Sequence, residues 1–249
     1  MSNSIYATLS RQDGLLKELQ VVANNIANTN TTGYKTDRAI FAEYLVSTGD
    51  QTPSLSMGAL AGHTFDLTQG TVKFTGGQFD LAIQGEGFFA LQTPAGERLT
   101  RAGAFQLSAT GELITPDGAN VLDSGNTPIQ IPPEAASISI AGDGAISADG
   151  ELLGQIGVFR ANGQLQRDTD TRFTAEGGTE AIENANVLQG AVEQSNVSPV
   201  LEMARMIEVQ RAYEAGQNVL EQEHQRITQY ISTVGNRLAQ EVSLEVSPF

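Results

Sequence analysis

Apolar side chains recur every three or four residues near the start of the chain. The row comprises Ile5, Leu9, Leu16, Leu19, Ala23 and Ile26, with the polar Gln12 in one position. This spacing is the heptad pattern of a helix that packs against another helix. It predicts a helix of about 25 residues, or roughly 37 Å at 1.5 Å per residue.

A second and longer heptad row lies near the end of the chain. One line of this row is apolar throughout and comprises Met206, Tyr213, Leu220, Ile227 and Val234. The other line carries the polar Gln210, Gln217 and His224 at seven-residue intervals. A single long helix cannot bury such a stripe within itself, so the pattern predicts helical partners.

Local signals place the start of this second helix and its ion pairs. Ser198 and Pro199 supply an N-cap and a proline that fits the first helical turn. Arginines follow Glu202, Glu208 and Glu223 by three residues, which predicts ion pairs along the helix.

The middle of the chain has short apolar runs separated by turn signals. Thr115–Gly118, Ala148–Gly150 and Ala161–Gly163 are hairpin-type turns, because glycine accepts the positive φ that such turns require. Residues 41–185 hold 21 of the 26 glycines. The spacing of the turns favours antiparallel β structure over βαβ units.

These patterns predict a mixed α and β fold in three parts. Residues 1–45 form an N-terminal helix followed by a polar loop, and residues 46–185 form an antiparallel β-rich middle domain. Residues 186–249 form a C-terminal helix and tail. We expect the two terminal helices to build a coiled-coil-like α domain, and the middle to fold on its own.

Composition and charge narrow the range of functions. The net charge is −15, and residues 41–185 carry eighteen acidic against six basic side chains, so binding to nucleic acid is not expected. The chain has no cysteine and only two histidines, which leaves too few ligands for a zinc site. No apolar stretch is long enough to span a membrane, and the first residues lack the pattern of a cleaved signal peptide.

Candidate chemical motifs each have a simpler structural interpretation. Gly85–Gly87 lacks the third glycine of a dinucleotide-binding loop and predicts a tight turn. Asp168–Asp170 opens like a calcium loop, but Arg172 occupies the next ligand position. His224 has no partner for acid–base catalysis. We therefore expect no catalytic residue, no metal, no cofactor and no small-molecule substrate.

A polar segment, ANNIANTNTTGYK at 23–35, follows the first predicted helix. Its asparagines and threonines compete with the backbone for hydrogen bonds, so it should end the helix in a bonded loop. The candidate motif residues are Ala23, Asn24, Asn25, Ala27, Asn28, Gly33, Tyr34 and Lys35. The string resembles the N-terminal motif of the bacterial flagellar rod and hook proteins, the axial-protein family.

Further stretches resemble the same family. LTQGTV at 67–72 leads to FDLAIQGEGFF at 79–89 and LTRAGAF at 99–105, while QGAVEQSNV at 189–197 and MIEVQRAYEA at 206–215 resemble its C-terminal signature. The second set adds Ser195, Asn196 and Val197 as motif residues. The chain is most similar to proximal rod proteins, with distal rod proteins as the alternative. Gly216 departs from the family pattern, in which Asn is common.

The resemblance implies a structural role. The partners would be other copies of the chain, other proximal and distal rod subunits, and the flagellar type III export apparatus. The location would be the basal-body rod that crosses the periplasm, reached without a cleaved signal. The two apolar heptad rows would form the assembly interface of an inner tube, and the subunit would transmit torque.

Two other classes remain as alternatives. A secreted β-rich binding protein would need an aromatic platform, yet aromatic residues make up only 6% of the chain. An acid-lined hydrolase could use Asp66, Asp80 and Glu86, although chance groupings are expected among so many acids.

Overall fold

The computed structural model describes residues 2–46 and 55–245 and groups the chain into two compact units. Unit 1 lies within Met1–Val21, Ala39–Gly62 and Met203–Phe249. Unit 2 comprises Val22–Arg38 and His63–Glu202. Each terminal helix has its longer part in unit 1 and a short part in unit 2.

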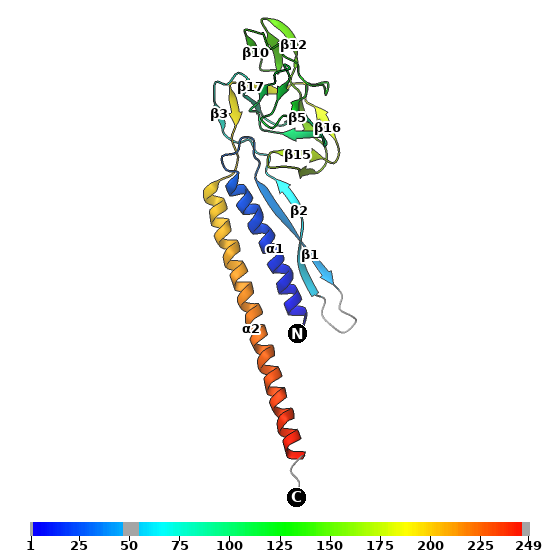
Figure 1. The fold of residues 1–249 in the computed structure, drawn as a ribbon, viewed down its shortest axis with the longest axis vertical. Coiled ribbons are helices and arrows are strands. Elements are labelled where there is room, and N and C mark those ends of the chain that lie inside the picture. The colour runs from blue at the N-terminus through cyan, green and yellow to red at the C-terminus, as the bar shows by residue number, and fades with distance from the viewer. Residues whose placement is uncertain (1, 47–54, 246–249) are drawn as a thin grey trace. The chain divides into compact units, whose positions relative to one another are not determined.

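Unit 1 is built on two antiparallel helices, α1 (Ser2–Ala27) and α2 (Pro199–Glu245), seen side by side in Figure 1. Arg205 Nη2 lies 2.9 Å from Glu18 Oε1, and Gln12 Nε2 donates to the backbone oxygen of Tyr213 at 2.8 Å. The unit also holds most of the two-stranded sheet of β1 (Asp37–Val46) and β2 (Leu55–Phe65). Neither helix has a segment apolar enough to cross a membrane within the described residues.

Gly216 brings the two helices of unit 1 close together. A Cβ at this position would lie 2.1 Å from Gln12 Nε2, so the amide of Gln12 occupies the space that a side chain would need. Gly216, which departs from the resemblance pattern, therefore leaves the space in which the buried side chain of Gln12 packs.

Unit 2 is rich in short antiparallel strands. They are β3 (Val72–Phe74), β4 (Leu81–Gln84), β5 (Phe88–Thr93), β6 (Gly96–Thr100), β7 (Gln106–Leu107), β8 (Leu113–Ile114), β9 (Asn120–Val121), β10 (Ile138–Ile140), β11 (Ala145–Ala148), β12 (Glu151–Gln155), β13 (Val158–Ala161), β14 (Leu165–Arg167), β15 (Arg172–Ala175), β16 (Thr179–Ala181), β17 (Asn186–Gln189) and β18 (Ala191–Glu193). Nine of them form one sheet that begins β14-β15-β6-β5-β9, and β10-β11-β12 form a second.

Strand β5 lies at the centre of unit 2 and is covered on both faces. Phe89 and Leu91 point into the larger apolar core, whereas Phe88 and Ala90 point into a smaller core that includes Phe173. Successive side chains of a strand point to opposite faces, so a continuous apolar run is what a doubly covered strand requires. This run positions the turn at Gly85–Gly87 beside the site described below.

The structure confirms two terminal helices and an antiparallel β-rich middle. Helix α1 ends at Ala27, within the Asn-rich segment, and α2 begins at Pro199 as predicted. The β structure extends beyond residue 185, because β17 and β18 pair with β4 and β3. Independent folding of the middle stays a prediction.

Candidate functional site

Residues from both ends of the chain meet in a largely buried polar cluster of unit 2. We call it the junction cluster, and its members are Asn25, Tyr34, Lys35, Arg101, Glu193, Asn196 and Glu202. Asn25 and Tyr34 come from the N-terminal motif, while Glu193 and Asn196 come from the C-terminal motif more than 150 residues later. The resemblance motifs therefore form one site rather than two.

Asn25 lies in the last turn of α1 and links the helix to both the following strand and α2. Its Oδ1 accepts hydrogen bonds from the hydroxyl of Tyr34 and the backbone nitrogen of Asp37, each at 3.0 Å. Its Nδ2 donates to Asp37 O at 2.9 Å and to Glu202 Oε2 at 3.2 Å. A buried amide with this many partners fixes the direction in which the chain leaves the helix.

Lys35 is fully buried and faces a carboxylate that is also buried. Its Nζ donates to Glu193 Oε1 at 2.6 Å and to Thr68 O at 2.7 Å. Burial lowers the pKa of Lys35, and the hydrogen bond and charge of Glu193 act against that shift. The carboxylate of Glu193 therefore favours the charged form of the Lys35 ammonium group, which burial disfavours.

Glu193 is shared between two cations. Its Oε2 lies 3.2 Å from Arg101 Nε, and its Oε1 also accepts from the backbone nitrogen of Gly70 at 3.0 Å. Arg101 in turn donates through Nη2 to Gly85 O at 2.6 Å. Burial lowers the pKa of Arg101, partly offset by Glu193. One carboxylate thus ties β18 to the loop before β3 and to the turn after β4.

Asn196 makes a second link between the ends of the chain. Its Oδ1 accepts from the backbone nitrogen of Thr36 at 2.8 Å and from Thr36 Oγ1 at 2.9 Å. Its Nδ2 donates to the backbone oxygens of Asp66 and Thr68 at 2.8 and 3.0 Å. Neighbouring Ser195 stabilises the same turn, because its Oγ accepts from Val197 N at 3.2 Å.

Tyr34 is covered by the guanidinium of Arg167. The carbon Cζ of Arg167 lies 4.4 Å from the centroid of the Tyr34 ring, and Nη2 donates to Lys35 O at 2.5 Å. Stacking of this kind is a favourable cation–π contact. Burial raises the pKa of Tyr34 to about 12, while the charge of Arg167 acts in the opposite direction.

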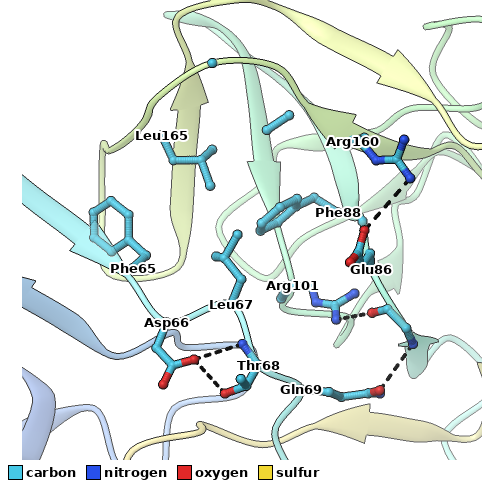
Figure 2. A pocket seen from close by; sticks show the side chains of 14 residues that line it. Phe65, Asp66, Leu67, Thr68, Gln69, Glu86, Phe88, Arg101, Arg160 and Leu165 are labelled. Atoms are coloured by element: carbon cyan, nitrogen blue, oxygen red, sulfur yellow. Dashed lines mark hydrogen bonds and ion pairs between the residues drawn. The ribbon is translucent and has the colours of Figure 1, made fainter.

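A pocket of about 690 Å³ opens next to the cluster, within unit 2. Its apolar side chains are Phe65, Leu67, Phe88 and Leu165, which point toward a common space in Figure 2. Arg101 lines the same pocket. Glu86 and Asp66 add carboxylates at its edge.

The structure places the other N-terminal motif residues around the bend. Gly33 has a φ of +72°, and a Cβ there would lie 2.2 Å from a backbone nitrogen, so only glycine fits without distortion. Asn28 is buried and donates to Asn24 O at 3.0 Å. Ala23 and Ala27 are exposed.

The predicted heptad rows differ in their burial. In α1, Leu9, Leu16 and Ala23 are exposed, whereas Ile5, Leu19 and Ile26 are half-buried. In α2, Met206, Tyr213, Leu220 and Ile227 are half-buried and Val234 is exposed. The polar positions Gln210, Gln217 and His224 are exposed, while Gln12 is buried. The burial of these residues within one chain does not test whether the two rows form the assembly interface, which stays a prediction.

One sequence-based interpretation of the ion pairs along α2 needs correction. The pairing of Glu202 with Arg205 is wrong, because Glu202 is buried against Asn25 and Arg205 contacts Glu18 instead. By contrast, Glu223 and Arg226 do pair, at 2.8 Å.

Sequence reasoning did not single out Arg101, Arg167, Glu193 or Glu202 as site residues. A signal existed for Glu193, an acid next to two apolar residues in the quoted motif QGAVEQSNV. Charged residues are rarely fully buried unless they are paired, so a charge in such a run indicates a buried partner. In the Asp168–Asp170 segment, which resembles the start of a calcium loop, the Asp168 carboxylate pairs with Arg98 at 2.8 Å.

Comparison with known proteins matches both halves of the junction cluster. The family described as "Flagella basal body rod protein" matches residues 5–35, and "Flagellar basal body rod FlgEFG protein C-terminal" matches 188–233. "Flagellar hook protein FlgE/F/G D1 domain" matches residues 82–148 in unit 2. These ranges cover Asn25, Tyr34 and Lys35 on one side and Glu193, Asn196 and Glu202 on the other.

Curated relatives match nearly the whole chain. "Flagellar basal-body rod protein FlgF" of Caulobacter vibrioides is 39% identical over 86% of this chain and 91% of its own length. The FlgF protein of Mesorhizobium japonicum is 34% identical over 95% of this chain and 100% of its own. "Flagellar basal-body rod protein FlgG" of Bacillus subtilis is 32% identical over 88% of this chain and 94% of its own length. The chain therefore belongs to the family of flagellar basal-body rod proteins.

Proposed function

We propose that this chain is a structural subunit of the flagellar basal-body rod, of the proximal, FlgF type. Family membership supports a structural role rather than an enzymatic one. The identity of 39% to the FlgF protein of Caulobacter vibrioides, against 34% to the FlgG protein of the same organism, supports the proximal position.

One observation on α2 carries the assembly part of the proposal. Large apolar side chains stay exposed along this helix, where a monomer would normally place polar residues. They are Val200, Leu201, Met203, Ile207, Val219, Tyr230, Ile231 and Val234. Exposed apolar surface of this extent marks an interaction face.

Helix α2 also continues well past the part that faces α1 in unit 1 (Figure 1). A helix side without a neighbour gains most of its stability from tertiary or quaternary packing. We infer that the apolar rows of α1 and α2 pack against helices of other copies and of other rod subunits, in a coiled-coil-like inner tube.

The junction cluster holds together the parts of α1 and α2 that belong to unit 2. It ties the end of α1 to the start of α2 through Asn25 and Glu202, and it ties both to β structure through Lys35, Glu193 and Asn196. Buried polar networks specify one geometry more sharply than apolar contacts do, although Arg101 Nη1 and Glu193 Oε2 of this cluster make no hydrogen bond.

Export and location follow from the same proposal. The subunit would leave the cytoplasm unfolded through the flagellar type III apparatus, without cleavage of a signal, and would join the rod in the periplasm. Mass spectrometry of the chain recovered from rods checks this point, since an intact N-terminal peptide is expected and a processed one would contradict it.

Genetic complementation tests the function and separates the two rod types. Expression of this chain should restore motility to a strain that lacks its FlgF-type gene and should fail in one that lacks its FlgG-type gene. The opposite result would assign the chain to the distal rod, to which relatives named FlgG also point. Full motility in the strain deleted for this gene would refute a rod function.

A further inference from the structure

One aromatic side chain protrudes from unit 2 without any covering residue. Phe74 ends β3 and is 74% exposed, more than any other large apolar side chain of residues 63–202 except Val200, which equals it. Burial of a phenylalanine is worth far more than burial of most other side chains, so its exposure in a folded domain calls for a partner.

Lys73, the residue before Phe74, carries a positive charge that has no partner within unit 2. Among residues 63–202, Lys73 is the one Lys or Arg side chain with neither an ion pair nor a hydrogen bond, whereas Arg98, Arg101, Arg160, Arg167 and Arg172 all have partners. This stretch of the chain is strongly acidic, so a free cation beside a free aromatic ring forms a distinctive pair.

The pocket beside the junction cluster has the complementary properties. Its volume of about 690 Å³ leaves room for a benzyl group, and Phe65, Leu67, Phe88 and Leu165 supply an apolar lining. Leu67 is itself 45% exposed, so a side chain from another molecule can reach the apolar lining. At the edge, Glu86 is largely exposed and has only a long contact of 3.9 Å with Arg160.

The protruding ring and the pocket belong to different elements of unit 2. Strand β3 pairs with β18, and neither strand contributes to the pocket lining. Phe74 is 74% exposed and is not part of the lining, so it does not fill this pocket within its own chain, and the pocket of a neighbouring copy is open to it.

We propose that Phe74 of one copy of this chain inserts into the pocket of the next copy, between Leu67 and Phe88, and that Lys73 then lies against Glu86. Such a contact joins two different surfaces, so each copy keeps one of the two surfaces free for a further copy. Repeated from copy to copy, it builds a ring or an open helical polymer. The inference rests on the proposed role as a rod subunit and names a second contact for it, in unit 2 rather than on the helices.

Disulfide trapping tests the contact directly, because the chain has no cysteine of its own. Full-length Phe74→Cys and Leu67→Cys variants are co-expressed, and their rods are isolated and oxidised. Cβ atoms of an inserted residue and its lining lie within disulfide range. Leu152→Cys, at a side chain that is 70% exposed, replaces Phe74→Cys in the matched control.

We expect the Phe74→Cys and Leu67→Cys pair to yield covalent dimers at least about tenfold faster than the control pair. Equal rates in rods that contain the chain would overturn the contact and leave the proposed function intact. Absence of the chain from rods would overturn both.

A second measurement uses association of the purified full chain. Phe74→Ala should weaken self-association by about tenfold to a hundredfold, whereas Phe74→Leu, which keeps an apolar side chain, should weaken it much less. Lys73→Glu and Glu86→Lys should each weaken it severalfold, and the two changes combined in one chain should restore it. Unchanged association of Phe74→Ala in sedimentation experiments would contradict the proposal.

Discussion

Replacement of Lys35 by methionine removes one of the two cations of the junction cluster while keeping most of its volume. Lys35 is 0% exposed and holds Glu193 Oε1 at 2.6 Å and Thr68 O at 2.7 Å. Methionine can make neither bond. The change therefore leaves a buried carboxylate and a buried carbonyl with fewer partners.

The remaining partners of Glu193 set the size of the effect. Removal of one member of a buried ion pair costs about 3–5 kcal/mol. Glu193 keeps its contacts with Arg101 Nε at 3.2 Å and Gly70 N at 3.0 Å. The loss in free energy of unfolding for Lys35→Met should therefore lie near the lower end of this range, at about 3 kcal/mol. Glu193→Gln leaves two buried cations and should lie near the upper end, at about 5 kcal/mol.

The assay is urea unfolding of the purified chain, followed by circular dichroism, for both single variants and the double variant. Because the residues are in contact, the double variant should cost about 1–3 kcal/mol less than the sum of the singles. Lys17→Met is the matched control, since Lys17 pairs with Asp13 in an exposed position, and it should leave stability unchanged. Equal losses for Lys35→Met and Lys17→Met would refute the account of the cluster.

Three further predictions concern other parts of the chain. The Tyr34 pKa near 12 lies above the ordinary value of 10.0, so its stabilising contribution is complete below pH 10 and is lost as pH rises to 12. That loss is about 3 kcal/mol at 1.36 kcal/mol per pKa unit, and Tyr34→Phe should remove it from alkaline unfolding curves. Gly33→Ala should cost about 1–3 kcal/mol more than Gly76→Ala, because the two glycines have a similar φ but only Gly33 would bring a Cβ into contact with backbone atoms, and a calorimetric scan of both variants checks this difference. The double variant Leu220→Asp/Ile227→Asp should be exported at normal levels yet give non-motile cells, because it places charges in the helix contacts of the rod, and a motile strain would show that this row is not the assembly surface.

Local structure was readable from the sequence because local chemistry decides it. The asparagines after Ala23 end α1 at Ala27, and Pro199 begins α2, since capping and proline geometry act over a few residues. The glycine-containing turns also lie between strands as expected. These features need no knowledge of the rest of the fold.

The junction cluster was not readable in the same way. Lys35 and Glu193 are 158 residues apart, and no spacing rule connects them. Glu202 fits an exposed i,i+3 pair with Arg205 just as well as a buried contact with Asn25, and only the tertiary structure decides between them. A single sequence shows which residues are polar, but it does not show which of them meet.

The helix rows show a related limit. The row through Met206 and Tyr213 is half-buried, but the other buried line of α2 runs through Val209 rather than through the predicted Gln210. A difference of one residue turns the helix face by about 100°. The heptad pattern identifies the stripe, and the neighbouring helix decides its centre.

Immunogold labelling of purified basal bodies tests the central claim most directly. Cells carry this chain with an epitope in the exposed segment around Leu152, and the basal bodies are imaged after labelling. The account predicts label along the rod, inside the ring-bearing section, and none on the hook or filament. Basal bodies with complete rods but without label, in cells that express the tagged chain and swim normally, would contradict it.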